Sequence, residues 1–306
     1  MRQLILLYWG CVFLMYLSQV YYPETEQIED AATRKRHFML RRADIFMIIV
    51  IAWMTCFSFL RTSYNDTGTY IAHFWSAESV ADFFSRKGFL DWTGNPFSEL
   101  YRDIVRGATT DYHIYFFFPA VLSSFAVVKL FKRCSVAPAF SLLIFFSIGT
   151  YVTYVAALKQ CFAVFFLLLA LPYAIDKKYV RFYLLVFVAI LFHTHAFMFA
   201  IVPILMGKPW GKVTWLGVAF TVFAMLTYDY TLGAFMRYAQ SLGALVDEGE
   251  LFDGHSINIL RVFVYWVPPL IALLFRKRLF SDSSRSENLF VNMSSVSALI
   301  LTLGLV

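Results

Sequence analysis

Polar side chains that could do chemistry interrupt two long apolar runs of the sequence. Lys159 and Gln160 follow the run from Leu142 to Ala157, and His193 interrupts the run from Phe182 to Ile204. A Lys inside a bilayer costs about 2.5–3.5 kcal/mol on insertion scales, so it usually has a partner or a function. An ammonium group can bind phosphate, and a neutral imidazole can accept a proton. The alternatives are a Lys that snorkels from a helix end and a His packed in the core.

A second set of polar residues lies between two apolar segments, in the stretch 61–112. Asp66 and Thr67 precede an amphipathic stretch through Phe74, so they could cap that helix only, or cap it and also contact a substrate. Glu99 and Arg102 have the spacing of an i,i+3 surface pair, which is the simplest interpretation of each. The stretch 61–112 therefore holds candidate groups with a structural alternative for each.

The sequence contains no motif for a nucleotide or a metal. It lacks a Walker loop, a GxSxG turn and a zinc-type helix. His193 and His195 are two residues apart, which in a helix splays them by about 200° and argues against a shared metal. The four cysteines lie in or at the ends of apolar runs and have no metal-ligand spacing. We therefore expect no cofactor and no metal.

The composition identifies a multispanning membrane protein. The 306 residues are 60% hydrophobic and 15% charged, unlike a soluble domain. The net charge of +6 comes from short basic clusters between apolar segments, where the positive-inside rule places them. Because no basic face forms on a soluble module, nucleic acid is not an expected partner.

Apolar periodicity predicts a single all-α transmembrane domain over residues 1–306 with about nine to ten membrane segments. The predicted segments are 3–21, 43–60, 113–131, 136–156, 160–175, 180–193, 195–207, 212–228, 259–275 and 288–306. The basic clusters mark cytoplasmic connections, among them Lys129 with Lys132 and Arg133. Outer loops are then expected at 61–112, with helices in the interface plane at 70–75 and 80–84, and at 229–258.

One connection is too short for this topology. Only about 26 residues separate Arg181 from Lys208, fewer than two full spans need. We therefore predict a broken or hairpinned pair that turns at His193-Thr194-His195, because irregular backbone is tolerated where it is buried in protein or lines a wet cavity. One long tilted helix from Val180 to Met206 is the alternative.

Several of these residues together resemble the EpsG family of Wzy-like membrane proteins of bacterial exopolysaccharide synthesis. The resemblance is a basic residue plus Gln at 159–160, the basic loop 176–181, an apolar helix ending in Phe192-His193, and the turn around Asp66 with Tyr70 one helical turn later. Here Lys159 stands where the family usually has Arg. A Lys is a point charge, whereas Arg would hold a phosphate bidentately. The family's late-span Arg is matched by Arg261.

The resemblance implies a GT-C-like glycosyltransferase of the bacterial cytoplasmic membrane. It would join oligosaccharide repeat units carried on undecaprenyl diphosphate at the outer face, in contact with membrane lipid and other polysaccharide-assembly proteins. The diphosphate site would use Arg61, Arg102, Lys159, Gln160 and Arg261, and the general base would be His193, Asp66 or Glu99. Thr67 and Tyr70 would orient the acceptor. A transporter of lipid-linked oligosaccharide and a non-catalytic subunit of a secretion complex are the alternatives.

The predicted topology is tested by single cysteines and an impermeant thiol reagent in intact cells. Cysteines at Asp66, Thr194 and Gly254 should label, whereas cysteines at Ser135, Lys177 and Ser281 should stay protected. Labelling at Ser281 together with protection at Gly254 would establish the long single helix instead.

Overall fold

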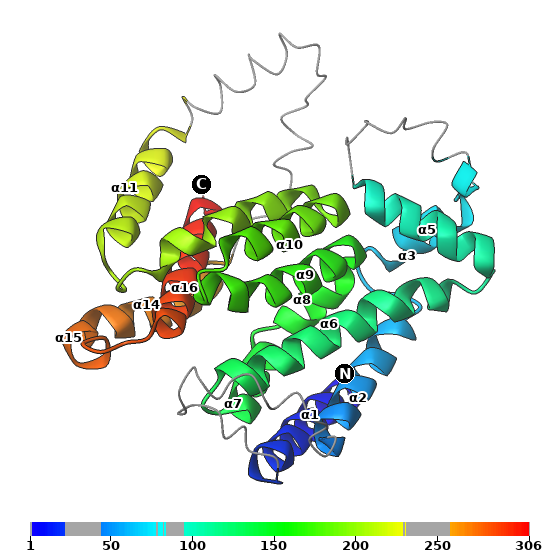
Figure 1. The fold of residues 1–306 in the computed structure, drawn as a ribbon, viewed down its shortest axis with the longest axis horizontal. Coiled ribbons are helices and arrows are strands. Elements are labelled where there is room, and N and C mark those ends of the chain that lie inside the picture. Colours follow the sequence, from blue (N-terminus) through cyan, green and yellow to red (C-terminus); the bar gives the residue numbers. More distant parts are fainter. Residues whose placement is uncertain are drawn as a thin grey trace. The chain divides into compact units, whose positions relative to one another are not determined.

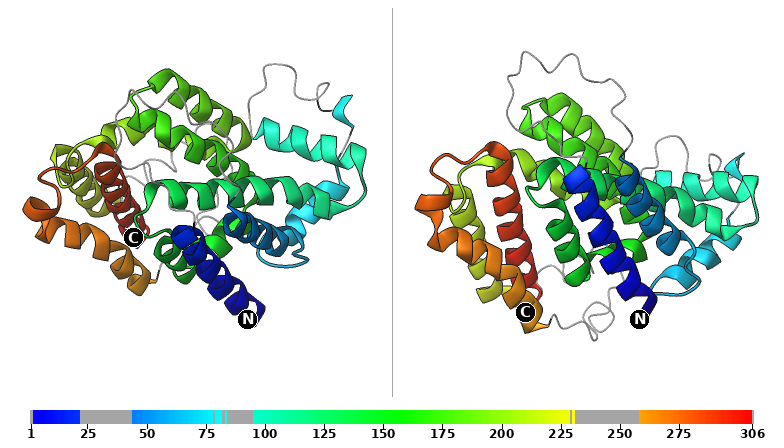
Figure 2. Two further views of the ribbon diagram at one scale, coloured as in Figure 1. Left: turned by 60° about the horizontal axis from the view of Figure 1, so that its bottom comes forward. Right: turned by 90° about the horizontal axis from the view of Figure 1, so that it is seen from below.

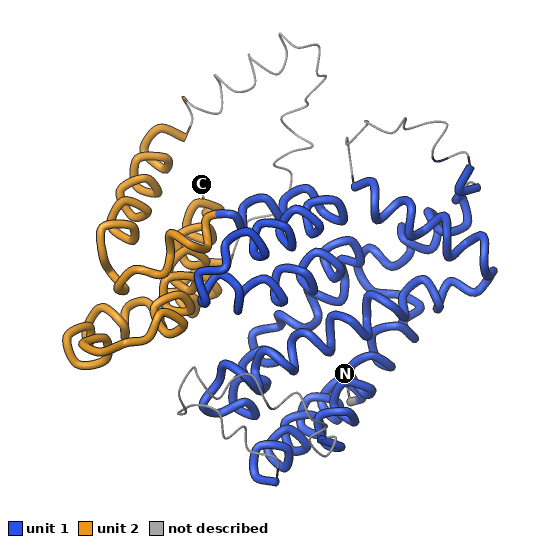
Figure 3. The backbone as a smooth tube through the Cα atoms, viewed as in Figure 1, with its two compact units in different colours: residues 1–200 blue, residues 201–306 orange. Residues whose placement is uncertain are grey.

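The computed structural model describes residues 2–21, 44–77, 79–81, 83, 95–228, 230 and 258–305. These described residues form helices and their connections, without a strand. The chain divides into two compact units, residues 1–200 and residues 201–306, which are coloured separately in Figure 3. The all-α prediction is confirmed. The outer loop 229–258 lies almost entirely outside the described residues.

The first unit contains the helices drawn from blue to green in Figure 1. They are α1 (Arg2–Tyr21), α2 (Ile45–Phe59), α3 (Thr67–Trp75), α5 (Pro96–Ala108), α6 (Tyr112–Cys134), α7 (Pro138–Ser147), α8 (Thr150–Ala156), α9 (Leu158–Ile175) and α10 (Tyr179–Phe192). The 3-10 helix η1 (Thr194–Met206) begins in this unit and ends in the second.

The second unit is built around helix α16. Its helices are α11 (Lys212–Leu226), α14 (Ile259–Leu274), α15 (Arg276–Leu279) and α16 (Arg285–Leu303). The buried Asn292 of α16 donates from Nδ2 to the carbonyls of Leu205 and Gly207, at 2.7 and 2.8 Å, and its Oδ1 accepts the Thr214 hydroxyl at 3.1 Å. One side chain thus holds the end of η1 and the start of α11 against α16.

Among the described residues, three helices are long and apolar enough to cross a membrane: Gln3–Tyr21, Tyr112–Cys134 and Leu158–Ile175. A fourth is reached if α7 and α8, bent by 67° at their junction, form one span. The other apolar helices have 10–17 residues. At 1.5 Å per residue, the 15 residues of α2 cover about 22 Å of a hydrocarbon core about 30 Å thick. The chain is a polytopic membrane protein, but fewer of its helices are full-length spans than the sequence predicted.

The predicted span at 136–156 is interrupted by a bend of 67° between α7 and α8. Helix α7 ends at Ser147 and α8 begins at Thr150, and the chain turns between them at Gly149, whose φ is +75°. This left-handed conformation is cheap only for glycine, so Gly149 permits the bend. An apolar run has no signal for such a bend other than the glycine itself.

The predicted break at His193 is confirmed. Helix α10 ends at Phe192, and His193 has the extended backbone angles φ −152° and ψ 110° before η1 begins. The Tyr183 hydroxyl of α10 donates to the Ala200 carbonyl of η1 at 3.4 Å, so η1 folds back along α10. The alternative of one continuous helix from Val180 to Met206 is excluded by this geometry.

An aromatic core joins the first helices of the chain. Tyr8 of α1 stacks on Phe146 of α7 with ring centroids 4.3 Å apart, and Tyr151 of α8 lies edge-on to Phe146 at 5.3 Å. Tyr151 also donates its hydroxyl to the Met54 carbonyl of α2 at 2.8 Å. Helices α1 and α2, drawn side by side in Figure 2, are thereby fixed to α7 and α8.

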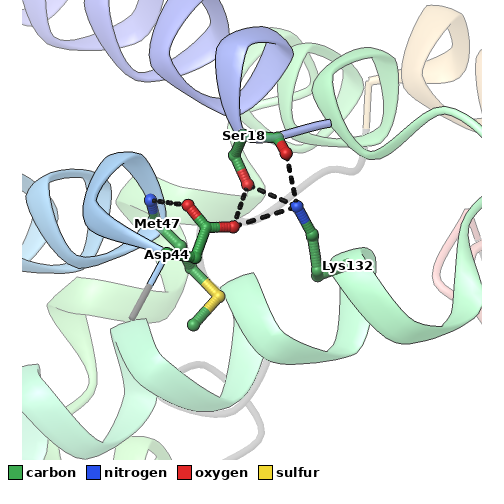
Figure 4. A network of polar contacts seen from close by, with 4 residues as sticks. All are labelled: Ser18, Asp44, Met47 and Lys132. Carbon is green, nitrogen blue, oxygen red and sulfur yellow. Dashed lines mark hydrogen bonds and ion pairs between the residues drawn. The ribbon is translucent and has the colours of Figure 1, made fainter. Parts of the chain in front are cut away.

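A buried ion pair ties three helices together (Figure 4). Lys132, near the end of α6, donates to the Asp44 carboxylate at 3.0 Å and to the hydroxyl and carbonyl of Ser18 in α1 at 2.6 and 2.7 Å. Asp44 also accepts the Met47 N–H at 3.0 Å and so caps α2. Lys132 thus lies in the last turn of α6 rather than in the connection that follows it, and its predicted cytoplasmic side stays a prediction. Its side chain is buried because Asp44 and Ser18 satisfy all its donors.

The Asp44 charge is maintained by these bonds. Burial alone would raise the pKa of the Asp44 carboxyl, but hydrogen bonds from Ser18, Met47 and Lys132 outweigh burial and hold the pKa below its usual range. A carboxyl whose pKa is depressed in the folded state stabilises the fold above its ordinary pKa. The stabilisation is lost as the pH falls through the folded-state value.

We expect Lys132→Met to destabilise the protein by about 3 kcal/mol, because it leaves a buried carboxylate unpaired. Asp44→Asn should have a similar effect, and the double substitution should cost less than the sum of the two. Unfolding of the detergent-solubilised protein measures these changes. Lys129→Met is the matched control, because Lys129 is exposed on the same helix. Additive losses would show that Lys132 and Asp44 act independently.

Candidate functional site

Tyr70 of α3 connects the polar residues of the first unit. Its hydroxyl lies close to the backbone of Lys159, in the first turn of α9, and within electrostatic range of Arg61 and Asp66. Burial raises the pKa of this hydroxyl, and the Asp66 charge adds to the effect, so Tyr70 stays neutral at physiological pH. The structure therefore brings together Arg61, Asp66, Tyr70 and Lys159, which the sequence had only suggested as separate candidates.

Arg61 is fixed at one end of its guanidinium group. Its Nη1 donates to the Val155 carbonyl near the end of α8, and the group lies 4.4 Å from the ring centroid of Phe116. Nε and Nη2 are buried and have no hydrogen-bond partner among the described residues. This free edge is the side with which Arg holds a carboxylate or a phosphate bidentately. Burial lowers the pKa of Arg61, although an Arg stays charged at neutral pH.

The turn before α3 is strained and presents Asp66. Tyr64 and Asn65 have φ values of 132° and 44°, in the region that disfavours side chains. The fully buried Thr67 holds this turn, because its N–H and hydroxyl both donate to the Tyr64 carbonyl, at 3.1 and 2.6 Å. Thr67 is thus a buried residue that stabilises the turn, and its expected contact with an acceptor stays a prediction.

Asp66 occupies the N-cap position of α3 but makes no side-chain cap hydrogen bond. The side chain is exposed, and among the described residues no hydrogen bond to its carboxylate is found. The cap-only interpretation of Asp66 therefore lacks the contact that defines a cap. Its carboxylate is available beside Tyr70.

Lys159 lies in the first turn of α9 with a half-buried side chain. No hydrogen bond or ion pair to its ammonium group is found in the described part of the chain, and its charge reaches His193. Gln160 follows on the exposed surface. A helix N-terminus carries partial positive charge, so Lys159 adds to a region that already favours anions.

His193 has a half-buried ring at the α10–η1 break. Its Nδ1 is buried and has no partner among the described residues. Burial, His195 and Lys159 each lower the pKa of His193, so the imidazole is neutral at physiological pH. The expected splay of the two histidines is wrong. Because His193 is extended rather than helical, its ring lies 5.2 Å from that of the exposed His195. No group of three or more metal-ligating side chains occurs within the described residues.

Helix α5 carries the remaining acidic and basic candidates of the first unit. Arg102 pairs with the fully buried Asp103, with both Nε and Nη2 at 2.7 Å from Oδ1, so its charge is already balanced. Glu99 lies in the first turn, next to Ser98, whose hydroxyl donates to the Phe192 carbonyl at 2.7 Å. Arg102 thus has a structural role, whereas Glu99 lies on the turn of α5 that contacts the His193 break.

Aromatic rings form the apolar floor of this region. Tyr101 of α5 stacks on Tyr115 of α6 and meets Phe162 of α9 edge-on, with centroids 5.5 and 4.7 Å apart. Phe162 in turn stacks on Phe192 at 4.7 Å. These ring contacts hold α5, α6, α9 and α10 together.

The other predicted cation belongs to the second unit. Arg261 is exposed in the first turn of α14, and the site described here is built from the first unit alone. Sequence reasoning missed helix α5 and its first-turn residues Asn95 and Ser98, which contact the His193 break. Pro96 at the first helical position followed by Glu99 was the available signal for this helix.

The helices and the site define a polytopic, all-helical membrane protein with cations that lack a protein counter-ion in the described residues. A family model described as the EpsG family matches residues 44–306. The chain therefore belongs to the EpsG family, which associates it with exopolysaccharide biosynthesis. No curated protein sequence and no solved structure matches the chain.

We expect Asp66→Ala to leave the stability of the protein almost unchanged, because the carboxylate makes no cap bond. Asp111→Ala is the matched control. Asp111 is an N-cap that accepts the His113 N–H at 2.9 Å, so its loss should cost about 1 kcal/mol. Thermal unfolding in detergent measures both. A larger loss at Asp66 than at Asp111 would show that Asp66 is a structural cap after all.

Proposed function

We propose that this protein is a glycosyltransferase that polymerises lipid-linked oligosaccharide repeat units. The donor would carry undecaprenyl diphosphate, and the reaction would occur on the outer face of the bacterial cytoplasmic membrane. The observation that carries the proposal is the pair Arg61 and Lys159, two cations gathered around Tyr70 without a carboxylate bound to either in the described residues. The chain's membership of the EpsG family supports the same class of reaction.

Uncompensated buried charge explains why an anion is the expected ligand. A cation that is shielded from water and has no partner is costly, so a site that holds Arg61 and the half-buried Lys159 favours an anionic ligand. The diphosphate of a lipid carrier is such an anion, and it lies at the membrane surface. The free edge of Arg61 would hold one phosphate, and Lys159 would approach the other as a point charge.

The chemistry assigned to the residues is a displacement at the anomeric carbon. The acceptor hydroxyl gives its proton to the neutral imidazole of His193, and its oxygen forms the new bond to the anomeric carbon. The bond from that carbon to the diphosphate oxygen breaks, and its electron pair stays on the leaving diphosphate. Arg61 and Lys159 stabilise the charge that develops on that oxygen. Asp66, exposed beside Tyr70, is the competing base, and Glu99 is the third.

The experiment is turnover of a purified lipid-linked repeat unit, followed as a ladder of chain lengths. Lys159→Ala should abolish the ladder, whereas Lys159→Arg should keep or raise turnover because the fork geometry is gained. His193→Gln should reduce kcat by about 100-fold or more, the usual contribution of a general base, while substrate still binds. Arg133→Ala in the last turn of α6 is a control that also removes one cation.

The outcomes separate the roles of these residues. Normal turnover by Lys159→Ala would assign Lys159 to a snorkelling helix end. Near-normal turnover by His193→Gln would move the base to Asp66 or Glu99. A wild-type protein that yields no ladder but moves the lipid-linked substrate across vesicles would be a transporter, the alternative that the bent α7–α8 pair favours, since transporters use broken helices.

A further inference from the structure

The two peptide groups that join His193 to the chain are both held by the first turn of α5. The Ser98 hydroxyl donates to the Phe192 carbonyl at 2.7 Å, on one side of His193. On the other side, the Thr194 N–H donates to the Asn95 Oδ1 at 2.9 Å. The first turn of α5, about 95 residues away in the sequence, therefore hydrogen-bonds the backbone of the residues immediately before and after His193.

The backbone groups of His193 itself are also bonded. Its N–H donates to the Ala189 carbonyl, the last helical bond of α10, and its carbonyl accepts the Ala196 N–H, both at 2.9 Å. Extended backbone at the end of a helix would otherwise leave polar groups without partners in apolar surroundings, which is costly. The contacts from α5 complete the hydrogen bonding of the break.

Asn95 makes this contact in place of a local one. It is the N-cap residue of α5, where an Asn side chain normally accepts an N–H of its own helix and contributes about 1 kcal/mol. Its side chain makes no such bond to α5 and reaches Thr194 instead, accepting the Thr194 hydroxyl as well at 3.4 Å. Asn95 therefore bonds to Thr194 in place of capping its own helix, which indicates that the long-range contact is the more favourable of the two.

Aromatic packing fixes the same turn from a second direction. Phe97 of α5 lies edge-on to Phe192, with ring centroids 5.5 Å apart, and Phe192 also stacks on Phe166 of α9 at 5.6 Å. The first turn of α5 thus contacts the break through polar groups and a ring, which leaves little freedom for rotation of the His193 backbone.

We propose that Asn95 and Ser98 are positioning residues that hold the His193 imidazole at the reaction site through the two flanking peptide groups. The proposal rests on the proposed function, because it takes His193 as the base. The titratable groups whose charge reaches that ring are Lys159 from α9 and His195 from η1, and Glu99 lies in the first turn of α5. Loss of these two hydrogen bonds would let the His193 ring move toward water and away from the acceptor hydroxyl.

The kinetic test uses the two positions separately. Ser98→Ala and Asn95→Leu should each lower kcat about 10-fold and leave KM for the lipid-linked repeat unit within about 2-fold, because misplacement of a base affects the chemical step. Asn95→Asp keeps an oxygen acceptor for the Thr194 N–H and should restore most of kcat. Ser76→Ala is the matched control, since the Ser76 hydroxyl also donates to a backbone carbonyl, that of His73 at 3.2 Å.

A second readout does not depend on polymerisation. Modification of His193 by diethyl pyrocarbonate, read by mass spectrometry across pH, reports the pKa of that ring. In the wild type this pKa should lie below the ordinary value of about 6.5, and in Ser98→Ala and Asn95→Leu it should rise toward that value as the ring gains water. His195 serves as the internal reference.

The outcomes distinguish this proposal from the proposed function. A shifted His193 pKa in a protein that makes no ladder would support the positioning role and overturn the polymerase. An unchanged His193 pKa, unchanged kcat, or a loss that Asn95→Asp does not restore would overturn the positioning role. Equal losses in Ser76→Ala would overturn it as well, since they would show a general effect on stability.

Discussion

A charged side chain among apolar residues is costly unless it has a partner. The first unit contains one charged side chain with a full set of partners and one without, near opposite ends of α6. Near the end of α6, Lys132 is fully satisfied by Asp44 and Ser18. Near its start, Tyr115 lies within range of Arg61, whose free guanidinium edge has no partner in the described residues. Tyr115 and Lys132 are 17 residues apart in α6, which places these clusters about 26 Å apart along the helix axis. The Lys132 cluster stabilises the bundle, whereas Nε and Nη2 of Arg61 have no hydrogen-bond partner among the described residues.

Composition and apolar periodicity were sufficient for the class of fold and for the break at His193. The break was predictable because the chain between Arg181 and Lys208 is too short for two spans. The bend at Gly149 was not predicted, because one glycine in an apolar run is compatible with a continuous helix. Lys132 was predicted to lie in a cytoplasmic connection, since a sequence does not show that Asp44, 88 residues away, is its partner.

The sequence was sufficient to select the residues of the candidate site, but not to predict how they are arranged in space. Arg61, Asp66, Tyr70 and Lys159 were selected singly, and the structure brings them together because Tyr70 of α3 and Leu158 of α9 pack in one apolar cluster. The spacing of His193 and His195 misled us, because helical geometry was assumed where the backbone is extended. Asn95 and Ser98 were missed because their contacts are long-range, and a polar first turn of a helix is equally compatible with ordinary capping.

The end of the short helix α8, which follows the bend, provides the carbonyl that orients Arg61. Because α8 ends at Ala156, the carbonyl of Val155 has no helical N–H to accept and is taken by Arg61 instead. The end of a helix carries a diffuse negative potential, equivalent to about half an elementary charge in a long helix and less in one this short. This potential orients the guanidinium without neutralising it, as a carboxylate would. An anion could therefore bind to Arg61 and leave again without competing against a permanent counter-ion.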